Sequence, residues 1–344
     1  MNNISFFLFS QKLNNNFYLL LFKNIFLTNK LLCDFMIWVV MNVDGNLYKE
    51  PFSKGVLARS LRLSSLSLDE AYEITADIEN KLIEENITEI SVYDLSEFVL
   101  KYLYDINPDL AVKYKKWRDI RTSNEPLIIL IGGASGVGTS SMAIELANRL
   151  GLKNIMSTDM IREVMRKIIS KELNPVVHKS SFDAYESIRT PAIRVDKVIE
   201  GFISHVDVVN VGIEAIIERS IKEGISVIIE GVHIVPGFLR EDLINRNNAI
   251  LITLTVEDEE MHKQRFYARC RQPWVKRSLD HYMENFTTIR KTQDFLIAQA
   301  DIHHTPVINN VDFRNTIDLM INAIIEQFGG EENDSKESIG NNDP

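Results

Sequence analysis

The pattern of apolar and polar residues divides the chain near Pro126. From Asn42 to about Arg121, a short extended stretch is followed by apolar residues at spacings of three and four, which is typical of amphipathic helices. After Pro126, short apolar runs alternate with helical patterns, which indicates parallel strands joined by helices. We therefore predict a small, mainly helical domain and a larger α/β domain, joined by a polar linker at 122–125.

Helix-capping residues are easy to recognise in the first domain. Ser67 and Glu70 form a capping-box pattern before an apolar helical stripe. Ser91 is expected to cap the next helix, and Asn107 followed by Pro108 suits the N-cap and first position of a third. Three helices are therefore expected in this domain.

The second domain contains four continuous apolar runs that lack the alternation of a half-buried strand. Such runs suit strands buried on both faces of a parallel sheet, as in a doubly wound α/β domain. The predicted strands are Leu127–Ile131, Val227–Ile229, Ile250–Val256 and Pro306–Ile308.

The two ends of the chain differ from the rest. The first forty residues are rich in Phe, Leu, Ile and Asn, but polar residues interrupt every apolar run before it reaches the roughly 18 residues that a membrane-spanning helix needs. No cleavage pattern of a signal peptide follows. We interpret Met41 as the true start and 1–41 as a non-native or disordered extension. The expected organisation continues with a helical domain at 42–122, an α/β domain at 126–328 and a disordered acidic tail at 329–344.

Charge and cysteine content argue against several classes of function and site. A formal net charge of −10 over 344 residues argues against general binding to nucleic acid, which depends on clustered Lys and Arg. Cys33 and Cys270 are far apart and lack metal-ligand spacing, so neither a disulfide framework nor a zinc site is predicted. We expect a cytoplasmic protein without a membrane or nucleic-acid partner, and the sequence does not indicate its oligomeric state.

A glycine-rich loop follows the first predicted strand and precedes a helical pattern. In this context successive backbone amides and a helix N-terminus can surround phosphate oxygens, which predicts a P-loop that binds ATP. A turn that merely joins strand to helix is the structural alternative. Ser140 falls where a P-loop hydroxyl binds magnesium. The predicted ATP-binding residues are Gly133, Ser135, Gly136, Val137, Gly138, Thr139 and Ser140.

The loop departs from the usual motif because Thr139 stands where Lys is expected. Another cation must then neutralise the β- and γ-phosphates. Arg265, Arg269 and Arg271 are the candidates, on a helix predicted from Val256 to Gln272 that could close over the nucleotide. An exposed basic helix without this role is the alternative.

A second group of candidates follows the next predicted strand, which ends at Ser157-Thr158-Asp159. Ligands of open α/β sheets bind at this edge, so Asp159 is a candidate for contact with the acceptor hydroxyl. Arg162 and Arg166 follow one turn apart and suit an acceptor that carries phosphate. A helix start with an acidic cap and a solvated basic stripe is the alternative.

Glu230 ends the apolar run Val227–Ile229, where a Walker-B acid holds magnesium, and it is the second predicted metal residue with Ser140. His233, just beyond, either contacts substrate or fixes the following turn. Ser180 and Ser181 lie in a polar segment that could bind the carboxylate of an acid.

These motifs resemble those of the archaeal 2-phosphoglycerate kinases over roughly 42–328. The resemblance rests on Gly132–Ser140, Ser157–Arg162, Ile229–His233 and the N-terminal Glu50–Gly55. It implies a P-loop kinase-like parallel sheet with flanking helices, preceded by a small ATP-cone-like domain that binds a regulatory nucleotide near Lys54 and Arg59, although a structural appendage is as plausible.

The resemblance also implies transfer of phosphate from ATP to 2-phosphoglycerate with Mg²⁺, giving 2,3-diphosphoglycerate, a precursor of its cyclic form. Asp159 would orient or deprotonate the hydroxyl, Arg162 and Arg166 would hold the acceptor phosphate, and Arg265 and Arg269 would stabilise the transferred group. Two alternatives stay open, namely a kinase of another small phosphate or nucleotide and a nucleotide sensor without catalysis. Thr139 favours the sensor, whereas the charged residues around the loop favour a kinase.

Overall fold

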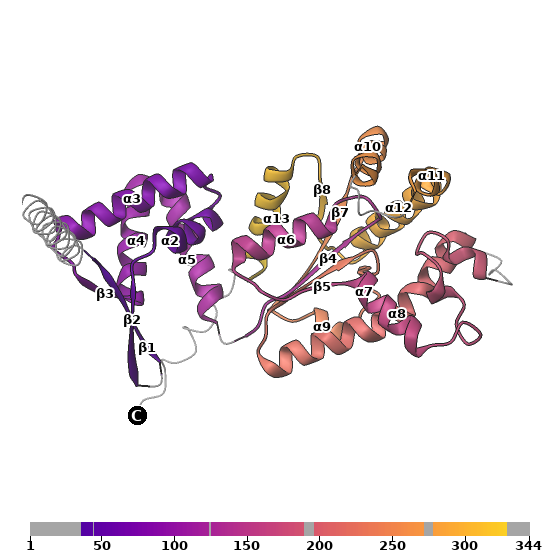
Figure 1. Cartoon of the computed structure of the whole chain (residues 1–344), viewed down its shortest axis with the longest axis horizontal. Coiled ribbons are helices and arrows are strands. Elements are labelled where there is room, and N and C mark those ends of the chain that lie inside the picture. Colours follow the sequence, from indigo (N-terminus) through magenta and orange to yellow (C-terminus); the bar gives the residue numbers. More distant parts are fainter. Residues whose placement is uncertain (1–35, 44, 124, 189–195, 272–277, 329–344) are drawn as a thin grey trace, which may run out of the picture. The chain divides into compact units, whose positions relative to one another are not determined.

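The computed structural model describes residues 36–43, 45–123, 125–188, 196–271 and 278–328. The expected N-terminal extension up to residue 35, the acidic tail, Cys33 and Gln272 lie outside the described residues. The chain divides into two compact units between Tyr114 and Lys115, and each unit is considered by itself (Figure 1). Among the described helices, none is long and apolar enough to cross a membrane.

The first unit combines helices with a small sheet that the sequence did not predict. Strand β1 pairs antiparallel with β2 and parallel with β3, in the order β2-β1-β3. Strand β1 begins at Trp38 and Ile37 is buried, so the strand extends across the boundary expected at Asn42. The elements are β1 (Trp38–Val43), β2 (Asn46–Pro51), α2 (Lys54–Leu61), η1 (Arg62–Ser64), α3 (Leu68–Glu84), β3 (Glu89–Ser91), α4 (Val92–Ile106) and the beginning of α5 (Pro108–Thr122), within which the division between the units falls.

The predicted helix caps are confirmed. Ser67 Oγ accepts from the backbone amide of Glu70, and Glu70 Oε2 accepts from the amide of Ser67, so the capping box is complete. Ser91 Oγ accepts from the amide of Asp94 at the start of α4, and α5 begins at Pro108. Each cap satisfies amides that have no partner within the helix, which fixes where these helices begin.

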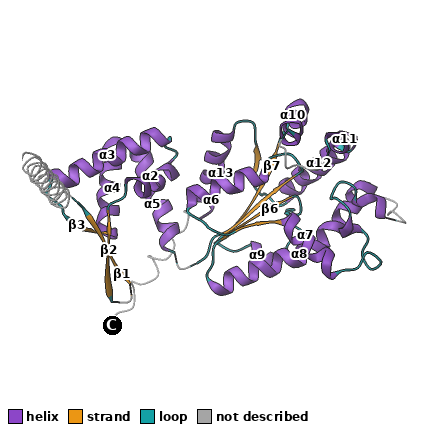
Figure 2. Ribbon diagram, viewed as in Figure 1, coloured by secondary structure: helices purple, strands orange, loops and turns teal. Residues whose placement is uncertain are grey.

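The second unit is built on a five-stranded parallel sheet with the order β5-β6-β4-β7-β8. Its strands are drawn in orange in Figure 2, where β6 and β7 are labelled. The four apolar runs predicted as strands are confirmed. The strand predicted to end at 157–159 is β5, which ends at Ser157, so Thr158 and Asp159 begin α7 instead. The elements are β4 (Ile128–Gly133), α6 (Thr139–Leu150), β5 (Ile155–Ser157), α7 (Thr158–Ile168), η2 (Val176–His178), η3 (Ala184–Ser187), α8 (Lys197–Glu223), β6 (Val227–Gly231), α9 (Glu241–Ile244), β7 (Ala249–Thr255), α10 (Glu259–Cys270), α11 (Leu279–Glu284), α12 (Phe286–Ile302), β8 (Val307–Asn309) and α13 (Phe313–Phe328).

Helices cover both faces of this sheet. Helices α6 and α13 contact one another on one face, and α8 and α9 lie on the other (Figure 1). Ile128 and Leu130 of β4 pack into the core that α8 helps to form, so the alternate residues Ile129 and Ile131 face the opposite layer. Because every strand is parallel, the carboxyl ends of β4, β5 and β6 meet at one edge, where ligands of such sheets bind.

The predicted helix from Val256 starts later than expected. Val256 is buried directly after β7, and α10 begins at Glu259 with Asp258 as its N-cap. The arginines of this segment therefore lie on a shorter helix than the sequence suggested.

Candidate active site

The glycine-rich loop has the backbone of a phosphate-binding loop. It leaves β4 at Gly133 and enters α6 at Thr139, and Gly136 and Gly138 have φ angles of +89° and +98°. A Cβ atom at Gly136 would lie 2.5 Å from Phe266 Cζ. Both the left-handed backbone and the close approach of α10 therefore require glycine at position 136.

Three side chains hold the carbonyl groups of the loop. His262 Nε2 donates to the Ser135 carbonyl at 2.8 Å, while Arg265 Nη1 and Asn310 Nδ2 donate to the Val137 carbonyl at 2.7 and 2.8 Å. In a trans peptide the carbonyl and the following amide point in opposite directions. The amides that follow these two carbonyls therefore point away from the three donors, into the loop, where a phosphate would bind.

Glu230 lies against the loop from the end of β6. It is buried, and its two carboxylate oxygens accept from Thr139 Oγ1 at 2.7 Å and from Ser140 Oγ at 3.0 Å. Ser140 is exposed, so its hydroxyl remains open to the space beside the loop. The two residues predicted as metal ligands are thus in contact, although they are separated by 90 positions in the sequence.

The structure corrects the role expected of Arg265. Its guanidinium donates to the carbonyls of Val137 and Asn310, on the side of the loop opposite the inward amides. Burial lowers the pKa of this arginine. Arg265 therefore ties α10 to the loop and to the end of β8, and it does not face the transferred phosphate.

Arg269 differs from Arg265 in being exposed, with its guanidinium 5.9 Å from the ring centroid of Tyr282. The ring of Tyr282 stacks on that of Phe266, with 4.5 Å between the ring centroids. Its centroid is also 6.2 Å from that of Phe182, which lies in the segment between η2 and η3. Helices α10 and α11 thus connect the P-loop to that segment. Arg269 remains the candidate for charge neutralisation, and Arg271 is likewise exposed.

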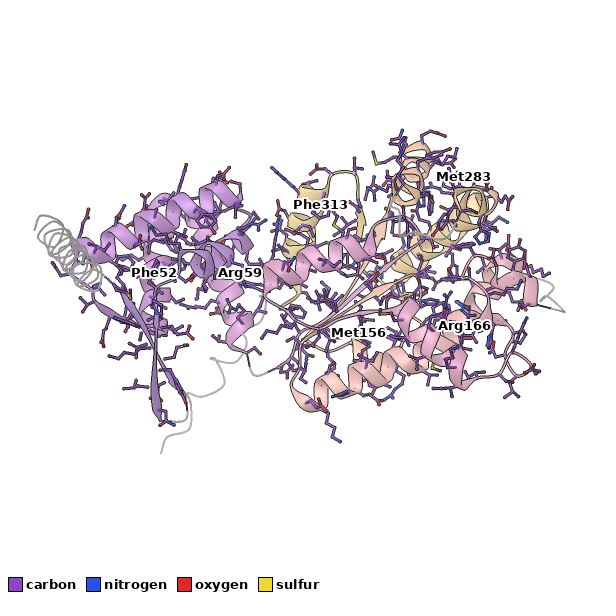
Figure 3. The ribbon with its side chains drawn as sticks, in the orientation of Figure 1. Phe52, Arg59, Met156, Arg166, Met283 and Phe313 are labelled. Carbon is purple, nitrogen blue, oxygen red and sulfur yellow. The ribbon has the colours of Figure 1, made fainter. Side chains whose placement is uncertain are left out.

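On the acceptor side, Asp159 and Arg162 come together at the start of α7. Asp159 keeps 68% of its side-chain surface exposed and lies 3.8 Å from Arg162 Nη1. Arg162 is mostly buried and donates to the Lys179 carbonyl at 3.3 Å and to Glu163 Oε1 at 3.2 Å. Arg166 also donates to Glu163, at 2.6 Å, and lies further along α7 (Figure 3). These two cations lower the pKa of Glu163 in spite of the partial burial that opposes them.

Two predicted substrate residues are closed to substrate. His233 is fully buried between Thr158 and His205, so its side chain contacts α7 and α8 and does not bond to the turn that follows it. Ser181 is buried as well, whereas Ser180 is partly exposed and interacts with Asp183. Burial raises the pKa of Asp183, whose carboxylate lies 3.3 Å from His281 Nε2 of α11.

Comparison with known proteins identifies the family. A family model described as the ATP cone domain matches residues 43–123. The 2-phosphoglycerate kinase of Methanothermobacter thermautotrophicus is 51% identical over 304 residues, which cover 88% of this chain and 99% of that protein. The 2-phosphoglycerate kinase of Methanopyrus kandleri is 43% identical over 299 residues, covering 87% of this chain and 91% of that protein. The chain belongs to the 2-phosphoglycerate kinase family.

Membership of the 2-phosphoglycerate kinase family confirms the resemblance seen in the motifs. Among solved structures, shikimate kinase from Acinetobacter baumannii in complex with shikimate matches 61% of this chain and 97% of its own, with 16% sequence identity and a TM-score of 0.37.

The ATP-cone match, at 43–123, includes Lys54 and Arg59 of the first unit, near which a regulatory nucleotide was predicted. Lys54 begins α2 and pairs with Glu79 Oε2 of α3 at 2.5 Å. Arg59 lies in the last turn of α2 and is exposed (Figure 3). Of these two cations, Arg59 is therefore the more available to a phosphate group.

The donor set at the P-loop fits a magnesium ion of the kind that kinases use. Mg²⁺ keeps several waters and binds one or two carboxylates together with substrate phosphates. Ser140 and Glu230 offer a hydroxyl and a carboxylate at the mouth of the loop. Within the described residues, no group of three or more His, Cys, Asp or Glu side chains could hold a metal ion by itself. The ion would therefore need the phosphates of the nucleotide as further ligands.

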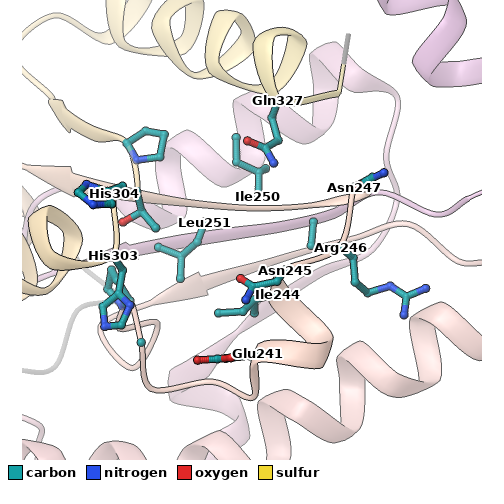
Figure 4. Close-up of a pocket in the computed structure, with 15 residues that line it drawn as sticks. Glu241, Ile244, Asn245, Arg246, Asn247, Ile250, Leu251, His303, His304 and Gln327 are labelled. Atoms are coloured by element: carbon teal, nitrogen blue, oxygen red, sulfur yellow. The ribbon is translucent and has the colours of Figure 1, made fainter. Parts of the chain in front are cut away.

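A cavity of about 310 Å³ lies elsewhere in the second unit, beside the amino ends of β7 and β8 (Figure 4). Ile250 and Leu251 line it, together with His303 and His304, which come from the end of α12. The P-loop follows the carboxyl end of β4, at the other edge of the same sheet. This cavity is therefore separate from the candidate active site.

Two residues that build the site were not singled out by the sequence as parts of it. His262 binds a P-loop carbonyl, and His205 supports His233. Asn310 was expected, from its position after the last strand, where an adenine loop would begin, and its side chain binds the P-loop carbonyl of Val137. His262 and His205 carried no such signal, since each is a single histidine within a helical pattern.

Proposed function

We propose that this protein transfers the γ-phosphoryl group of ATP to the free hydroxyl of 2-phosphoglycerate, giving 2,3-diphosphoglycerate and ADP. The observation that carries the proposal is the contact of Ser140 and Glu230 beside a P-loop whose amides point inward. The choice of 2-phosphoglycerate as the acceptor is based on the relatives named 2-phosphoglycerate kinase, which are similar over most of the chain.

The loop residues bind the donor. Amides between Gly133 and Ser140 surround the β- and γ-phosphates, and the positive end of α6 adds to their attraction. Ser140 and Glu230 would hold Mg²⁺, which would supply positive charge to the phosphates. Thr139 does not replace the missing lysine, because its hydroxyl donates to Glu230. Arg269 is the cation that neutralises the transferred group.

The start of α7 binds the acceptor. 2-Phosphoglycerate carries a phosphate and a carboxylate, so it requires cations at its site, which Arg162 and Arg166 provide. Asp159 is the exposed carboxylate at this sheet edge, and it orients the attacking hydroxyl and accepts its proton. Phosphoryl transfer depends chiefly on positioning and charge neutralisation, and these residues supply both.

The first unit serves as a nucleotide-binding regulatory domain in this proposal, with Arg59 as its phosphate contact. Cyclisation of the diphosphate product would follow in a later, separate reaction. Both the Mg²⁺ requirement and a cytoplasmic location belong to the same proposal.

The test is ADP release from Mg-ATP by the purified protein, with 2-phosphoglycerate, 3-phosphoglycerate or AMP as acceptor. Turnover with 2-phosphoglycerate, absent with the other two and lost in Asp159→Asn, is the expected result. Asp301→Asn, which makes the same change at an exposed position of α12, should keep wild-type turnover.

Two other outcomes contradict the proposal in different ways. Preference for AMP or 3-phosphoglycerate would show that the acceptor is wrong while the kinase assignment stands. Saturable ATP binding without turnover on any acceptor would show that the chain is a nucleotide sensor, which the absence of the P-loop lysine would then explain.

A further inference from the structure

A buried chain of polar side chains lies beneath the acceptor end of α7. His233 Nδ1 lies 2.8 Å from Thr158 Oγ1, and His233 Nε2 lies 3.0 Å from His205 Nδ1. The two imidazole rings are 4.8 Å apart between centroids and tilted by 41°. All three side chains are fully buried. The chain therefore joins the first residue of α7 to the loop after β6 and to the middle of α8.

Arg162 lies one helical turn after Thr158 on α7. Its Nη1 atom donates to the backbone carbonyl of Lys179. The chain of polar side chains ends at His205, whose Nε2 atom is buried and has no hydrogen-bond partner among the described residues. Thr158 and Arg162 therefore hold the two ends of the first turn of α7, which carries Asp159.

The backbone beside this chain of side chains requires glycine at position 231. Gly231, at the end of β6, has a φ angle of +137°, and a Cβ atom there would overlap with Thr158 Oγ1. Only glycine lets the threonine hydroxyl pass over this strand end to reach His233. The close approach indicates that the Thr158 contact is part of the fold and is not a chance surface contact.

Both histidines are neutral near pH 7. Burial is the main cause that lowers the pKa of His233 to about 3 and that of His205 to about 2, and the Arg162 charge lowers both further. A neutral imidazole offers one donor and one acceptor nitrogen, so it can pass one hydrogen bond along a chain in one direction. The pair adds no charge that would compete with Arg162 for the anionic acceptor.

We propose that His205 and His233 are positioning residues that hold the first turn of α7 so that Asp159 and Arg162 meet the acceptor. The inference rests on the proposed function, because it assigns that turn to the acceptor. Neither histidine touches substrate. Their effect is therefore specific to the acceptor and leaves the binding of ATP at the P-loop unchanged.

The experiment compares steady-state kinetics of the full-length wild type with those of two variants at one position. His205→Leu removes the hydrogen bond to His233, whereas His205→Asn keeps a polar atom near the place of Nδ1. We expect His205→Leu to lower kcat/KM for 2-phosphoglycerate at least about tenfold, as a small misplacement of a binding group does, with KM for ATP within about twofold. His205→Asn should recover activity to within about threefold of wild type.

A second pair of variants distinguishes the loss of a positioning contact from a general loss of folding. Thr158→Val keeps the side-chain shape but removes the hydroxyl, and it should reproduce the acceptor-specific loss. Thr292→Val, the matched control, removes a buried hydroxyl from α12 that bonds only within its own helix, and it should leave both substrates unaffected. The melting temperature of each variant is measured alongside.

The outcomes separate the two proposals. A wild type that does not turn over 2-phosphoglycerate contradicts the proposed function and with it the premise of this inference. A wild type that does, with His205→Leu and Thr158→Val both unchanged or with KM for ATP and 2-phosphoglycerate raised equally, contradicts the positioning role alone. If His205→Leu does not fold, Thr158→Val and His205→Asn decide by the same criteria.

Discussion

Ser140 of α6 donates its hydroxyl hydrogen to Glu230 of β6 at 3.0 Å, and the neighbouring Thr139 donates to the other oxygen of the same carboxylate at 2.7 Å. Glu230 is buried, and a buried carboxylate requires compensation for its lost hydration. The hydroxyl groups of Thr139 and Ser140 supply this compensation. Because Ser140 is exposed, a cation can reach the contact between Ser140 and Glu230 from one side. The relationship therefore marks where the metal of a kinase would bind.

Replacing Glu230 by Gln should weaken the response to magnesium. The amide is neutral and offers one oxygen, so we expect the free Mg²⁺ concentration that gives half-maximal activity to rise about 10–100-fold. ADP release at saturating ATP and increasing free Mg²⁺ measures this. Glu326→Gln makes the same change at an exposed position of α13 and should behave as wild type. An unchanged magnesium curve for Glu230→Gln would show that the carboxylate does not bind the ion.

The sequence predicted the parts of the site that depend on local pattern. Gly136 and Ser140 belong to one continuous strand–loop–helix motif, and Glu230 directly follows an apolar run. Each could therefore be recognised from the residues next to it in the sequence. Contacts set by tertiary packing could not be predicted. His262 binds a carbonyl 127 positions away, and Asn310 binds one 173 positions away.

The side of the loop on which Arg265 lies is also set by tertiary packing. A basic helix near a P-loop suggests phosphate contact, but the sequence does not tell on which side of the loop each arginine lies. The structure places Arg265 against the outward carbonyls and leaves Arg269 exposed. In the first unit, Trp38 and Val39 join a sheet because β2 and β3 pair with them, which no pattern within β1 itself indicated.

Substitutions of Arg265 and Arg269 should have different kinetic effects. Lys at position 265 cannot bind two carbonyls with one fixed fork, so the loop loses support and KM for ATP should rise about tenfold. Arg269→Ala should instead lower kcat about 100-fold with little change in KM, if the guanidinium acts on the transferred group. Initial rates over a matrix of ATP and 2-phosphoglycerate concentrations separate the two effects.

Arg219→Lys and Arg219→Ala, at an exposed position of α8, are the matched controls for Arg265→Lys and Arg269→Ala. Equal effects of Arg265→Lys and Arg269→Ala on KM for ATP would contradict the assignment of one arginine to the loop and the other to transfer.

Stability should fall with pH below about 6.5. His205 and His233 have folded-state pKa values of about 2 and 3, below the ordinary 6.5, so the unfolded chain binds protons that the folded chain does not. Their stabilising contribution is complete above pH 6.5 and is lost as the pH falls towards 3, by about 1.4 kcal/mol per pH unit for each imidazole.

Urea unfolding of the wild type and of His205→Leu at pH 7, 6 and 5 tests this dependence. The variant lacks one of the two imidazoles. The slope of its free energy of unfolding against pH should therefore be smaller than that of the wild type by about 1.4 kcal/mol per pH unit. His304→Leu, which removes an exposed imidazole, should keep the slope of the wild type. Parallel slopes for wild type and His205→Leu would mean that His205 is not held neutral by the fold.

Replacing Gly136 by Ala should disrupt the nucleotide site through two separate effects. The positive φ angle of +89° costs about 1–2 kcal/mol for any residue with a Cβ atom. The new methyl group would also meet Phe266 Cζ at 2.5 Å and His262 Nε2 at 3.0 Å, which pushes α10 away from the loop. Gly151→Ala isolates the first effect, because Gly151 has a φ angle of +71° and a Cβ atom there would meet nothing within 4 Å. Both variants should lose stability in thermal unfolding, but only Gly136→Ala should lose ATP binding in titration calorimetry. Equal ATP affinity in the two variants would mean that contact between α10 and the loop is not needed to shape the phosphate site.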